Sequence, residues 1–419
     1  MSVFVLNQRK KALMPTTSQK AKSLLKQGKA KVIKRTPFTI QLLVQTGETK
    51  QPLTLGIDTG SSIIGSAVVD SNNNVLYVSQ IEIRNDITKK MEQRSIYRQN
   101  RRNRKTRYRK PRFLNRSNSI REDRFSPTMR SKIESHLKEI KFAYSILPIT
   151  RLILETGTFD PHALKNPDVL TNKWLYQKGI NYGYANTKAY VLVRDNYTCQ
   201  HCKGKSGDRR LEVHHIIYQE YGGSDEETNL KTLCKTCHDK VHEGFLIIEG
   251  GHKKGQLKHA TQMNSIRKQL LKRLPEAEET FGFITKEHRQ LLKLDKTHCI
   301  DAVVIASEGS KFQYKVKNIL YKKCIADGDY QQTKGIRSEQ KIPTGKINGF
   351  RKFDKVKYLG KEYFIKGRMS TGYVILMDIE GKKIDFSQKE RGKKTVKMKD
   401  LKRIGSRKTW ITTSLPMSV

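Results

Sequence analysis

Two pairs of cysteines have the spacing of a metal site. Cys199 and Cys202 form one CxxC pair, and Cys234 and Cys237 form a second. Two chelating turns that present four soft thiolates suit a tetrahedral structural zinc ion. In a reducing compartment this spacing favours metal binding over disulfides. We therefore predict structural Zn²⁺ on these four cysteines.

Histidines flank the second cysteine pair. His238 and His242 follow it at i and i+4, so on a helix their side chains share one face and can chelate a single ion. His214 and His215 precede it on an expected strand. A histidine from that strand would complete three ligands and leave the ion room for water and a phosphate. This arrangement suits phosphodiester hydrolysis.

A second set of candidate ligands is spread along the chain. Asp58 ends an expected strand at 53–58, and Glu155 ends another at 151–155. His298 and Asp301 lie one turn apart at the start of an expected helix at 298–307. Two-metal hydrolysis of a phosphodiester needs converging carboxylates. Asp-x-Gly after a strand also opens the phosphate loop of actin-like ATPases, but the second such loop and the adenosine pocket are not evident.

The charge of the chain points to a polyanionic partner. Its 419 residues include 83 Lys+Arg and 40 Asp+Glu, a formal net charge of +43. Nucleic acid would relieve this self-repulsion. The alternatives are a lysine-rich solubility surface or binding to an anionic membrane. No apolar run reaches the roughly 18 residues of a membrane span, so we expect no membrane segment and a cytoplasmic protein.

Arginines dominate residues 84–118, where aliphatic side chains are scarce. A helix here would have no apolar face to pack, and a solvated charged helix is the simplest interpretation. The guanidinium fork suits bidentate phosphate contacts, which favours a helix that binds nucleic acid. The candidate nucleic-acid-binding residues are Arg94, Arg98, Arg101, Arg102, Arg104, Arg107 and Arg109.

The remaining pattern predicts the elements that position these groups. A basic module should contain strands at 3–6 and 39–44 and a helix at 18–29, and strands at 63–69 and 75–83 should follow the strand at 53–58. Ser126 and Pro127 indicate the N-cap and first residue of a helix that runs to about 147. A helix at 265–274 and a strand at 280–284 are expected, and alternation predicts strands at 356–359, 362–366 and 372–377 in a small barrel.

The stretch from Cys199 to His242 resembles the ββα-metal HNH endonucleases. The resemblance implies that His214, His238 and His242 bind a divalent ion. It also implies that His215 is the general base that activates water and that Asn229 orients this base.

Three further segments resemble those of RuvC nucleases: Gly56 to Gly60, Ile153 to Glu155 and His298 to Ala302. An arginine-rich helix follows the first segment, and the HNH stretch lies between the second and third. This order resembles IscB, the family of transposon-associated RNA-guided nucleases related to type II CRISPR effectors. Ala12-Leu-Met-Pro15 is similar to the Pro-Leu-Met-Pro module of that family, with alanine at its first position.

The resemblance implies an α/β multidomain fold. An RNase H-like (RuvC) mixed sheet would carry an inserted ββα-metal HNH domain, an arginine-rich bridge helix and a small C-terminal β-barrel-like domain. The expected parts are a PLMP-like module at 1–52, RuvC segment I at 53–83, the bridge helix at 84–118, RuvC segment II at 119–160, a linker at 161–184, the HNH domain at 185–250, RuvC segment III at 251–325 and a C-terminal domain for the target-adjacent motif at 326–419.

The resemblance also implies the activity. An omega RNA would guide the protein to double-stranded DNA, HNH would cut the guide-paired strand, and RuvC would cut the displaced strand. Asp58, Glu155, His298 and Asp301 would be the catalytic RuvC residues, with the three carboxylates binding Mg²⁺ or Mn²⁺, as the HNH site also would. One protein per RNA is expected, at the prokaryotic nucleoid.

Two other hypotheses are compatible with the sequence. An unguided HNH endonuclease would use the cysteine and histidine region and leave the RuvC-like segments idle. A zinc-stabilised RNA-binding protein without nuclease activity would use neither catalytic set.

Overall fold

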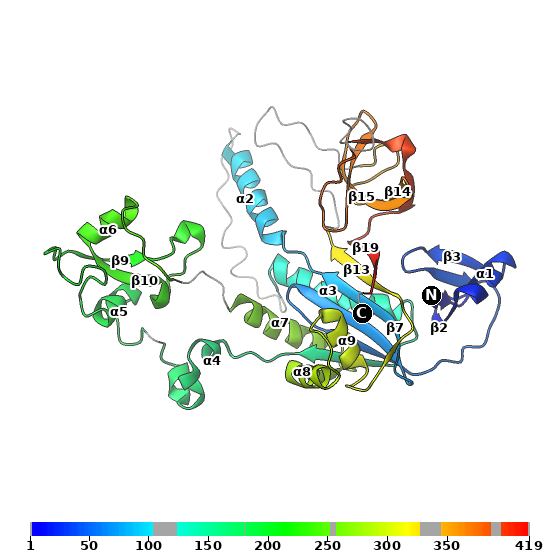
Figure 1. Cartoon of the computed structure of the whole chain (residues 1–419), viewed down its shortest axis with the longest axis horizontal. Coiled ribbons are helices and arrows are strands. Elements are labelled where there is room, and N and C mark those ends of the chain that lie inside the picture. Colours follow the sequence, from blue (N-terminus) through cyan, green and yellow to red (C-terminus); the bar gives the residue numbers. More distant parts are fainter. Residues whose placement is uncertain are drawn as a thin grey trace. The chain divides into compact units, whose positions relative to one another are not determined.

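The structure is a computed structural model that describes residues 2–103, 124–179, 181–251, 257–326, 345–386 and 395–417 (Figure 1). The predictions for Arg104, Arg107 and Arg109 fall outside the described residues. The chain divides into two compact units, Met1–Gly157 with Ser265–Val419, and Thr158–Asn264. We describe each unit by itself.

The first unit is built on an eight-stranded mixed sheet. Its strands run in the order β11-β8-β5-β6-β7-β13-β19, and β12 pairs with β7. Their bounds are β5 Leu53–Asp58, β6 Ile63–Asp70, β7 Asn74–Glu82, β8 Arg151–Thr156, β11 Glu278–Phe281, β12 Gln313–Tyr314, β13 Asn318–Cys324 and β19 Trp410–Pro416. The strands predicted at 53–58, 63–69 and 75–83 are confirmed as β5, β6 and β7. Strand β5 is apolar and nearly all buried, as expected for a strand covered on both faces.

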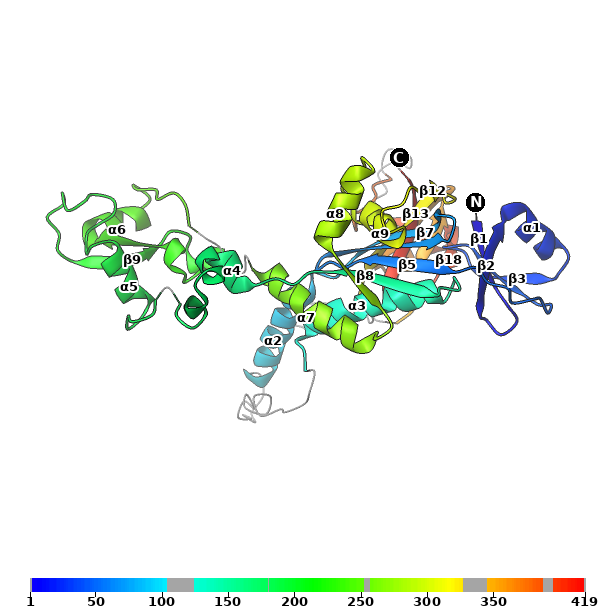
Figure 2. The same cartoon turned by 90° about the horizontal axis from the view of Figure 1, so that it is seen from below.

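Helices cover both faces of this sheet (Figure 2). Because side chains alternate along β7, Val78 points to one face and packs with α9, His298–Ala306, whereas Tyr77 and Ser79 point to the other face. Both of these bond Glu139 of α3, Pro127–Tyr144. The predicted N-cap is confirmed, since the Ser126 hydroxyl accepts a hydrogen bond from the backbone N–H of Met129.

A buried ion pair fixes α3 to the sheet. Lys322 Nζ of β13 lies 2.6 Å from Glu139 Oε2, and both side chains are fully buried. Lys322 also donates to the Tyr77 hydroxyl at 2.6 Å. Burial lowers the pKa of Lys322 to about 8, although the Glu139 carboxylate opposes the shift. The pair ties together β7, β13 and α3, elements far apart in the chain.

Two glycines allow α9 to lie close to the sheet. A Cβ on Gly65 of β6 would lie 1.9 Å from the His298 carbonyl oxygen, and one on Gly56 of β5 would lie 2.5 Å from the Ala302 carbonyl oxygen. Neither distance is compatible with any other residue unless α9 moves. The two glycines therefore determine how closely α9 approaches β5 and β6. Helix α9 carries His298 and Asp301, so the glycines also determine how closely these residues approach the strands.

The N-terminal module has more strands than the pattern predicted. It forms a four-stranded sheet in the order β2-β1-β4-β3, with one helix. The elements are β1 Ser2–Leu6, β2 Ala12–Thr17, α1 Ser18–Lys26, β3 Ala30–Lys34 and β4 Thr39–Leu42. Strands β2 and β3 were not expected, because β2 contains a proline and most of β3 is exposed.

The C-terminal region confirms the three predicted strands. Within the described residues it is an antiparallel sheet in the order β17-β16-β15-β14-β18. The bounds are β14 Lys355–Tyr358, β15 Lys361–Arg368, β16 Tyr373–Met377, β17 Val396–Lys397 and β18 Lys402–Gly405. The last strand, β19, pairs with β13 in the central sheet rather than with the C-terminal strands. Its pairing partner lies far back in the chain, which a local pattern does not show.

One sequence assignment is wrong in its extent. The expected strand at 280–284 ends at Phe281, and Gly282 begins helix α8, Gly282–Leu291. The helix expected at 265–274 is longer, α7 Lys258–Arg273. Within the arginine-rich segment, residues Ile87–Asn103 form helix α2. No helix of the described residues is long and apolar enough to span a membrane.

The second unit contains a small two-stranded sheet followed by a helix. The expected linker at 161–184 lies in this unit and includes α4 Pro161–Lys165, η1 Pro167–Leu170 and η2 Lys173–Tyr176. The rest comprises α5 Thr187–Arg194, β9 Leu211–His215, η3 Gln219–Tyr221, η4 Glu227–Asn229, β10 Leu230–Cys234 and α6 Lys235–His242.

Candidate nuclease sites

The hairpin of β9 and β10 positions the first histidines. The strands pair antiparallel, with His214 opposite Lys231 and His215 opposite Leu230. Neighbouring side chains on a strand point to opposite faces, so His214 is buried, 3% exposed, whereas His215 is partly accessible. The two histidines therefore face different environments and can have different roles.

Three histidines converge beside α6. The ligand nitrogens of His214, His238 and His242 all lie within 4.8 Å of one another. The two Nε2 atoms of His238 and His242 are 3.3 Å apart, as the helical spacing predicts. Burial, and then the neighbouring histidines, lower the pKa of His214 to about 4. Its neutral imidazole fits a divalent cation.

A carboxylate, Glu212, lies beside one of these histidines. Its Oε2 lies 3.1 Å from His238 Nδ1. The contact is an ion-pair distance without hydrogen-bond geometry, but a carboxylate near Nδ1 favours a proton there, and Nε2 faces His242. Glu212 is not among the predicted site residues, although a carboxylate two residues before His214 on the same strand face indicates such a partner.

His215 has a carboxylate partner of its own. Its Nε2 lies 3.0 Å from Asp225 Oδ1, and the Gln219 amide donates to the same oxygen. A proton held between Nε2 and Asp225 makes Nδ1 the nitrogen that can accept a proton. Asp225 was also missed, because it lies in a loop ten residues after its partner.

Asn229 holds the loop that follows His215. It is fully buried, and its amide donates to the carbonyl oxygens of Ile217 at 3.0 Å and Ser224 at 2.8 Å. Its Oδ1 accepts the Ile217 N–H at 3.0 Å. These bonds fix the backbone on either side of the turn, two residues after His215.

The four paired cysteines form a second cluster in this unit. Their sulfurs all lie within 4.8 Å of one another, and Cys202 Sγ and Cys234 Sγ are 3.7 Å apart. All four are free thiols. His201 Nδ1 lies 3.5 Å from Cys237 Sγ. The donor set fits a soft or borderline metal ion.

Asp58 and Glu155 meet on adjacent strands of the first unit. The parallel register of β5 and β8 places these two residues directly beside each other. His298 Nδ1 of α9 lies 2.6 Å from Asp58 Oδ2. Three segments far apart in the sequence thus come together at one end of the sheet, as predicted.

Burial shapes the electrostatics of this second site. It raises the pKa of Glu155 to about 7, and the neighbouring Asp58 carboxylate adds to the shift. Burial also raises the pKa of Asp58, which the hydrogen bond with His298 opposes. Glu155 Oε2 is buried without a hydrogen-bond partner among the described residues. Adjacent buried carboxylates with an unpartnered oxygen fit divalent cations.

Asp301 has a partner that the sequence did not suggest. The Arg289 guanidinium of α8 forms a buried ion pair with its Oδ1. Across the described part of the chain, the groups of three or more clustered ligands are the four cysteines and the three histidines. Asp58, Glu155 and Asp301 therefore approach one another without forming a cluster as tight as those two.

Comparison with known proteins identifies part of the chain. Residues 199–244 match the family model for HNH endonucleases, the region that holds both clusters of the second unit. The chain carries an HNH endonuclease domain. Residues 3–179 match a model described as RRXRR protein, which spans the N-terminal module, Asp58, Glu155 and α2.

Curated relatives resemble short stretches of this chain. Anaredoxin of a Nostoc species is 35% identical over 68 residues, 16% of this chain and 87% of the relative. The type IV methyl-directed restriction enzyme EcoKMcrA of Escherichia coli K12 is 37% identical over 62 residues, 13% of this chain and 22% of the enzyme. The chain thus spans about a fifth of the length of that enzyme.

A solved structure of Streptococcus thermophilus Cas9 in complex with the AGAA PAM aligns with 57% of this chain and 32% of its own. The sequence identity is 13% and the TM-score is 0.32, which is too low to support a conclusion about this chain.

The structure describes the side chains of only some of the candidate arginines of α2. Arg94 and Arg98 are exposed on this helix. Arg101 and Arg102 lie in its last turn, and their side chains fall outside the described part of the structure. The helix has little apolar surface to pack, as the composition predicted.

Proposed function

We propose that the protein is an RNA-guided, divalent-metal-dependent DNA endonuclease with two nuclease sites. The HNH domain would cut the DNA strand paired with the guide, and a RuvC-like site around Asp58 and Glu155 would cut the displaced strand. The observation that carries the proposal is the presence, in one chain, of two separate residue sets suited to phosphodiester hydrolysis.

In the HNH domain, His214, His238 and His242 would hold the divalent cation. When bound, the ion supplies positive charge that stabilises the leaving oxygen. His215 accepts a proton from water at Nδ1, because Asp225 occupies Nε2. Asn229 keeps the loop after His215 in place.

At the RuvC-like site, Asp58, Glu155 and Asp301 would hold Mg²⁺ or Mn²⁺, hard cations that prefer oxygen ligands. Asp301 bonds Arg289 through Oδ1, so Oδ2 is the oxygen it offers. His298, whose Nδ1 lies 2.6 Å from Asp58 Oδ2, would handle a proton at the scissile phosphate.

The four cysteines of the HNH domain would hold structural Zn²⁺. Four thiolates within one small cluster are the ligands of closed, tetrahedral zinc sites. The ion would link the loop at Cys199 to the start of α6 and so hold the helix that carries His238 and His242.

The guide is proposed from charge and motif order. A net charge of +43 and an exposed arginine-bearing helix favour a long polyanion that stays bound. The order of RuvC-like segments, arginine-rich helix and HNH domain is that of the IscB family. In that arrangement base pairing, rather than the protein, would select the DNA, with one RNA on each protein.

The test is to purify the chain from cells that also express its flanking noncoding DNA. The co-purified RNA is sequenced, and a plasmid matching its guide segment is incubated with the complex and Mg²⁺, with and without prior RNase treatment. We expect a discrete RNA, cutting of both strands at the matching site and loss of cutting after RNase.

The HNH domain alone favours a simpler alternative. If cleavage persists after RNase treatment and is not confined to the matching site, the chain is an unguided HNH endonuclease. Bound RNA without cutting in Mg²⁺ or Mn²⁺ would instead indicate an RNA-binding protein stabilised by zinc.

A further inference from the structure

A cavity of about 680 Å³ lies in the first unit, and its lining includes none of the candidate nuclease residues. Its wall comes from β3, α3, β14, β15 and the segment that leads into β19. We call it the basic cavity, because its lining includes Lys34, Lys138, Lys141 and Lys408. The nuclease proposal uses none of these residues.

The wall of the basic cavity is rich in positive charge. Its described wall contains seven Lys and Arg side chains and no carboxylate. Burial lowers the pKa of Lys34, and the charge of Lys408 lowers it further, so these two cations repel each other. Lys355 on the same wall is paired, at 2.6 Å, with Glu362. Bringing like charges together costs free energy unless an anion joins them.

Aromatic rings line the same cavity, and lysine ammonium groups of the cavity lie over the ring faces in cation–π contacts. Lys34 Nζ lies 4.8 Å from the centre of the Phe142 ring, and Lys138 Nζ lies 4.6 Å from that of Trp410. The ring faces therefore hold the ammonium groups in place instead of offering a surface for bases. Ammonium groups positioned in this way suit phosphate oxygens.

We propose that the basic cavity binds the phosphates of an unpaired RNA segment. A volume of about 680 Å³ is larger than one phosphate needs and too small for a duplex, so it suits a nucleotide or two of single strand. RNA is the occupant because the proposed function, on which this inference rests, keeps one RNA bound to each protein. The segment would join the N-terminal module, α3 and the C-terminal sheet.

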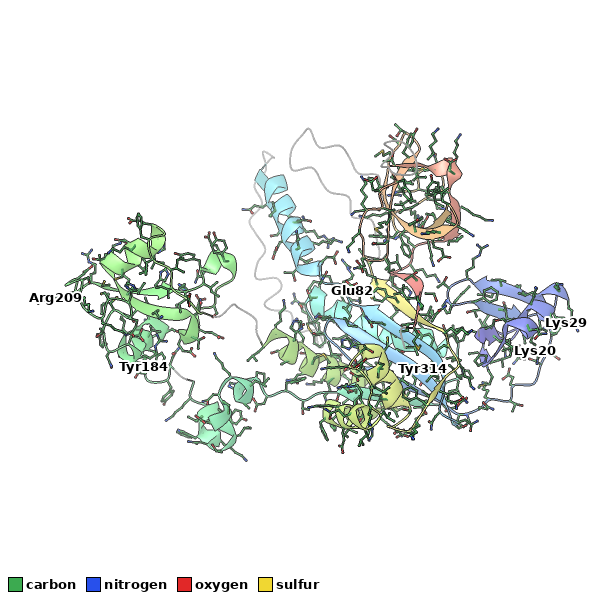
Figure 3. The ribbon with its side chains drawn as sticks, viewed as in Figure 1. Lys20, Lys29, Glu82, Tyr184, Arg209 and Tyr314 are labelled. Atoms are coloured by element: carbon green, nitrogen blue, oxygen red, sulfur yellow. The ribbon has the colours of Figure 1, made fainter. Side chains whose placement is uncertain are left out.

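The test compares two double variants of the full-length protein. Lys34→Ala with Lys408→Ala removes two cations of the cavity. Lys20→Ala with Lys29→Ala removes two exposed lysines of the same N-terminal module, both labelled in Figure 3. Binding of fluorescent 20-nucleotide oligo(U) is measured from about 50 to 200 mM salt without added divalent metal, and oligo(dT) of the same length is the parallel probe.

The cavity variant should lose salt dependence on RNA. The slope of log K against log salt should fall by about 0.7 per lost phosphate contact, or about 1.4 in all, and by clearly less in the control variant. The thermal midpoint of the cavity variant should not fall, because a repulsive pair is removed. A matching loss on oligo(dT) is compatible with the proposal, since the two probes share their phosphates.

Three results would overturn it: an oligo(U) slope equal to that of the wild type, an equal fall in the control variant, or a loss confined to oligo(dT). Cleavage plays no part in these measurements. A chain that binds oligo(U) through the cavity and cuts nothing would refute only the nuclease proposal. Guided cutting with an unchanged slope in the cavity variant would refute only the cavity.

Discussion

At the scale of single residues, the partners of the histidines matter as much as the histidines themselves. His215 is bonded to Asp225 and His298 to Asp58, and Glu212 lies 3.1 Å from His238 Nδ1, so in each case a carboxylate favours a proton on one ring nitrogen and leaves the other available. The sequence identified the histidines by type and spacing. Their carboxylate partners lie on other elements: a loop for His215, strand β9 for His238 and strand β5 for His298.

The Asp225 carboxylate provides a test of how His215 is positioned. Asp225→Asn should slow cutting of the guide-paired strand, by less than the roughly 10²- to 10⁴-fold loss expected for His215→Ala, since the base remains and only its orientation is weakened. Strand-resolved single-turnover rates measure this effect. The matched control is Glu226→Gln, which removes the neighbouring charge of an exposed ion pair with Lys165. Equal cleavage rates for Asp225→Asn and the wild type would show that Asp225 has no role in positioning His215.

His136 predicts a pH dependence of stability. It is fully buried on α3, its Nδ1 lies 2.8 Å from the Lys132 carbonyl oxygen, and burial lowers its pKa to about 4. The folded state therefore favours the neutral ring, whereas the unfolded state takes up a proton near pH 6.5. The free energy of unfolding that the neutral His136 contributes is fully present above pH 6.5 and is lost as the pH falls towards 4.

The expected loss between pH 7 and pH 5 is about 2 kcal/mol of unfolding free energy from this group alone. Urea titrations at both pH values measure it, with His136→Leu as the comparison because leucine keeps the site apolar. The variant should lose less stability than the wild type over this interval. The same pH dependence in both proteins would contradict the prediction.

At the scale of elements, the distance between α9 and the sheet decides whether the split site can form. Gly56 and Gly65 permit the approach, and the first turn of α9 carries His298 and Asp301 to Asp58. Helix α8 then supplies Arg289 to Asp301. The site thus depends on packing between elements that are each stable for local reasons.

Gly65→Ala should separate the two nuclease sites in function. Its Cβ would overlap the His298 carbonyl oxygen, so α9 must shift and the RuvC-like site should lose most of its activity. Cutting of the displaced strand should fall far more than cutting of the guide-paired strand. Gly47→Ala, where nothing lies within 4 Å of the added Cβ, is the matched control.

Equal loss of both cuts by Gly65→Ala in soluble protein would mean that α9 supports more than the RuvC-like site. A circular dichroism melt of each glycine variant shows whether the fold is retained before the two rates are compared.

At the scale of the whole molecule, the residues proposed for the two sites lie in different compact units, each set within a single unit. The HNH domain contains its histidines, cysteines and Asp225, whereas Asp58, Glu155, His298 and Asp301 belong to the first unit. A change in one site should therefore leave the residues of the other in place.

This separation predicts two nickases. His215→Ala should leave cutting of the displaced strand, and Asp58→Ala should leave cutting of the guide-paired strand, because each variant retains one intact site. A supercoiled plasmid should be relaxed but not linearised, and strand-specific end labels identify the cut. Loss of both cuts from either single change would contradict the two-site proposal.

The sequence by itself determined the local chemistry. The contacts within each CxxC pair and between His238 and His242 require only single turns, and short apolar runs between turn residues predicted β5, β6 and β7. Short-range geometry is enough for these features, because ligands one helical turn apart, or three residues apart in a turn, meet whatever the rest of the chain does.

Only the tertiary structure decided the long-range pairings. The register of β5 beside β8 joins Asp58 to Glu155, β13 pairs with β19, and the buried Lys322–Glu139 pair connects β13 to α3. Helix α8 also replaced an expected strand beyond Phe281. The physical reason is that strand pairing and burial of charge depend on partners far along the chain, and a local pattern of residue types does not specify which partner is chosen.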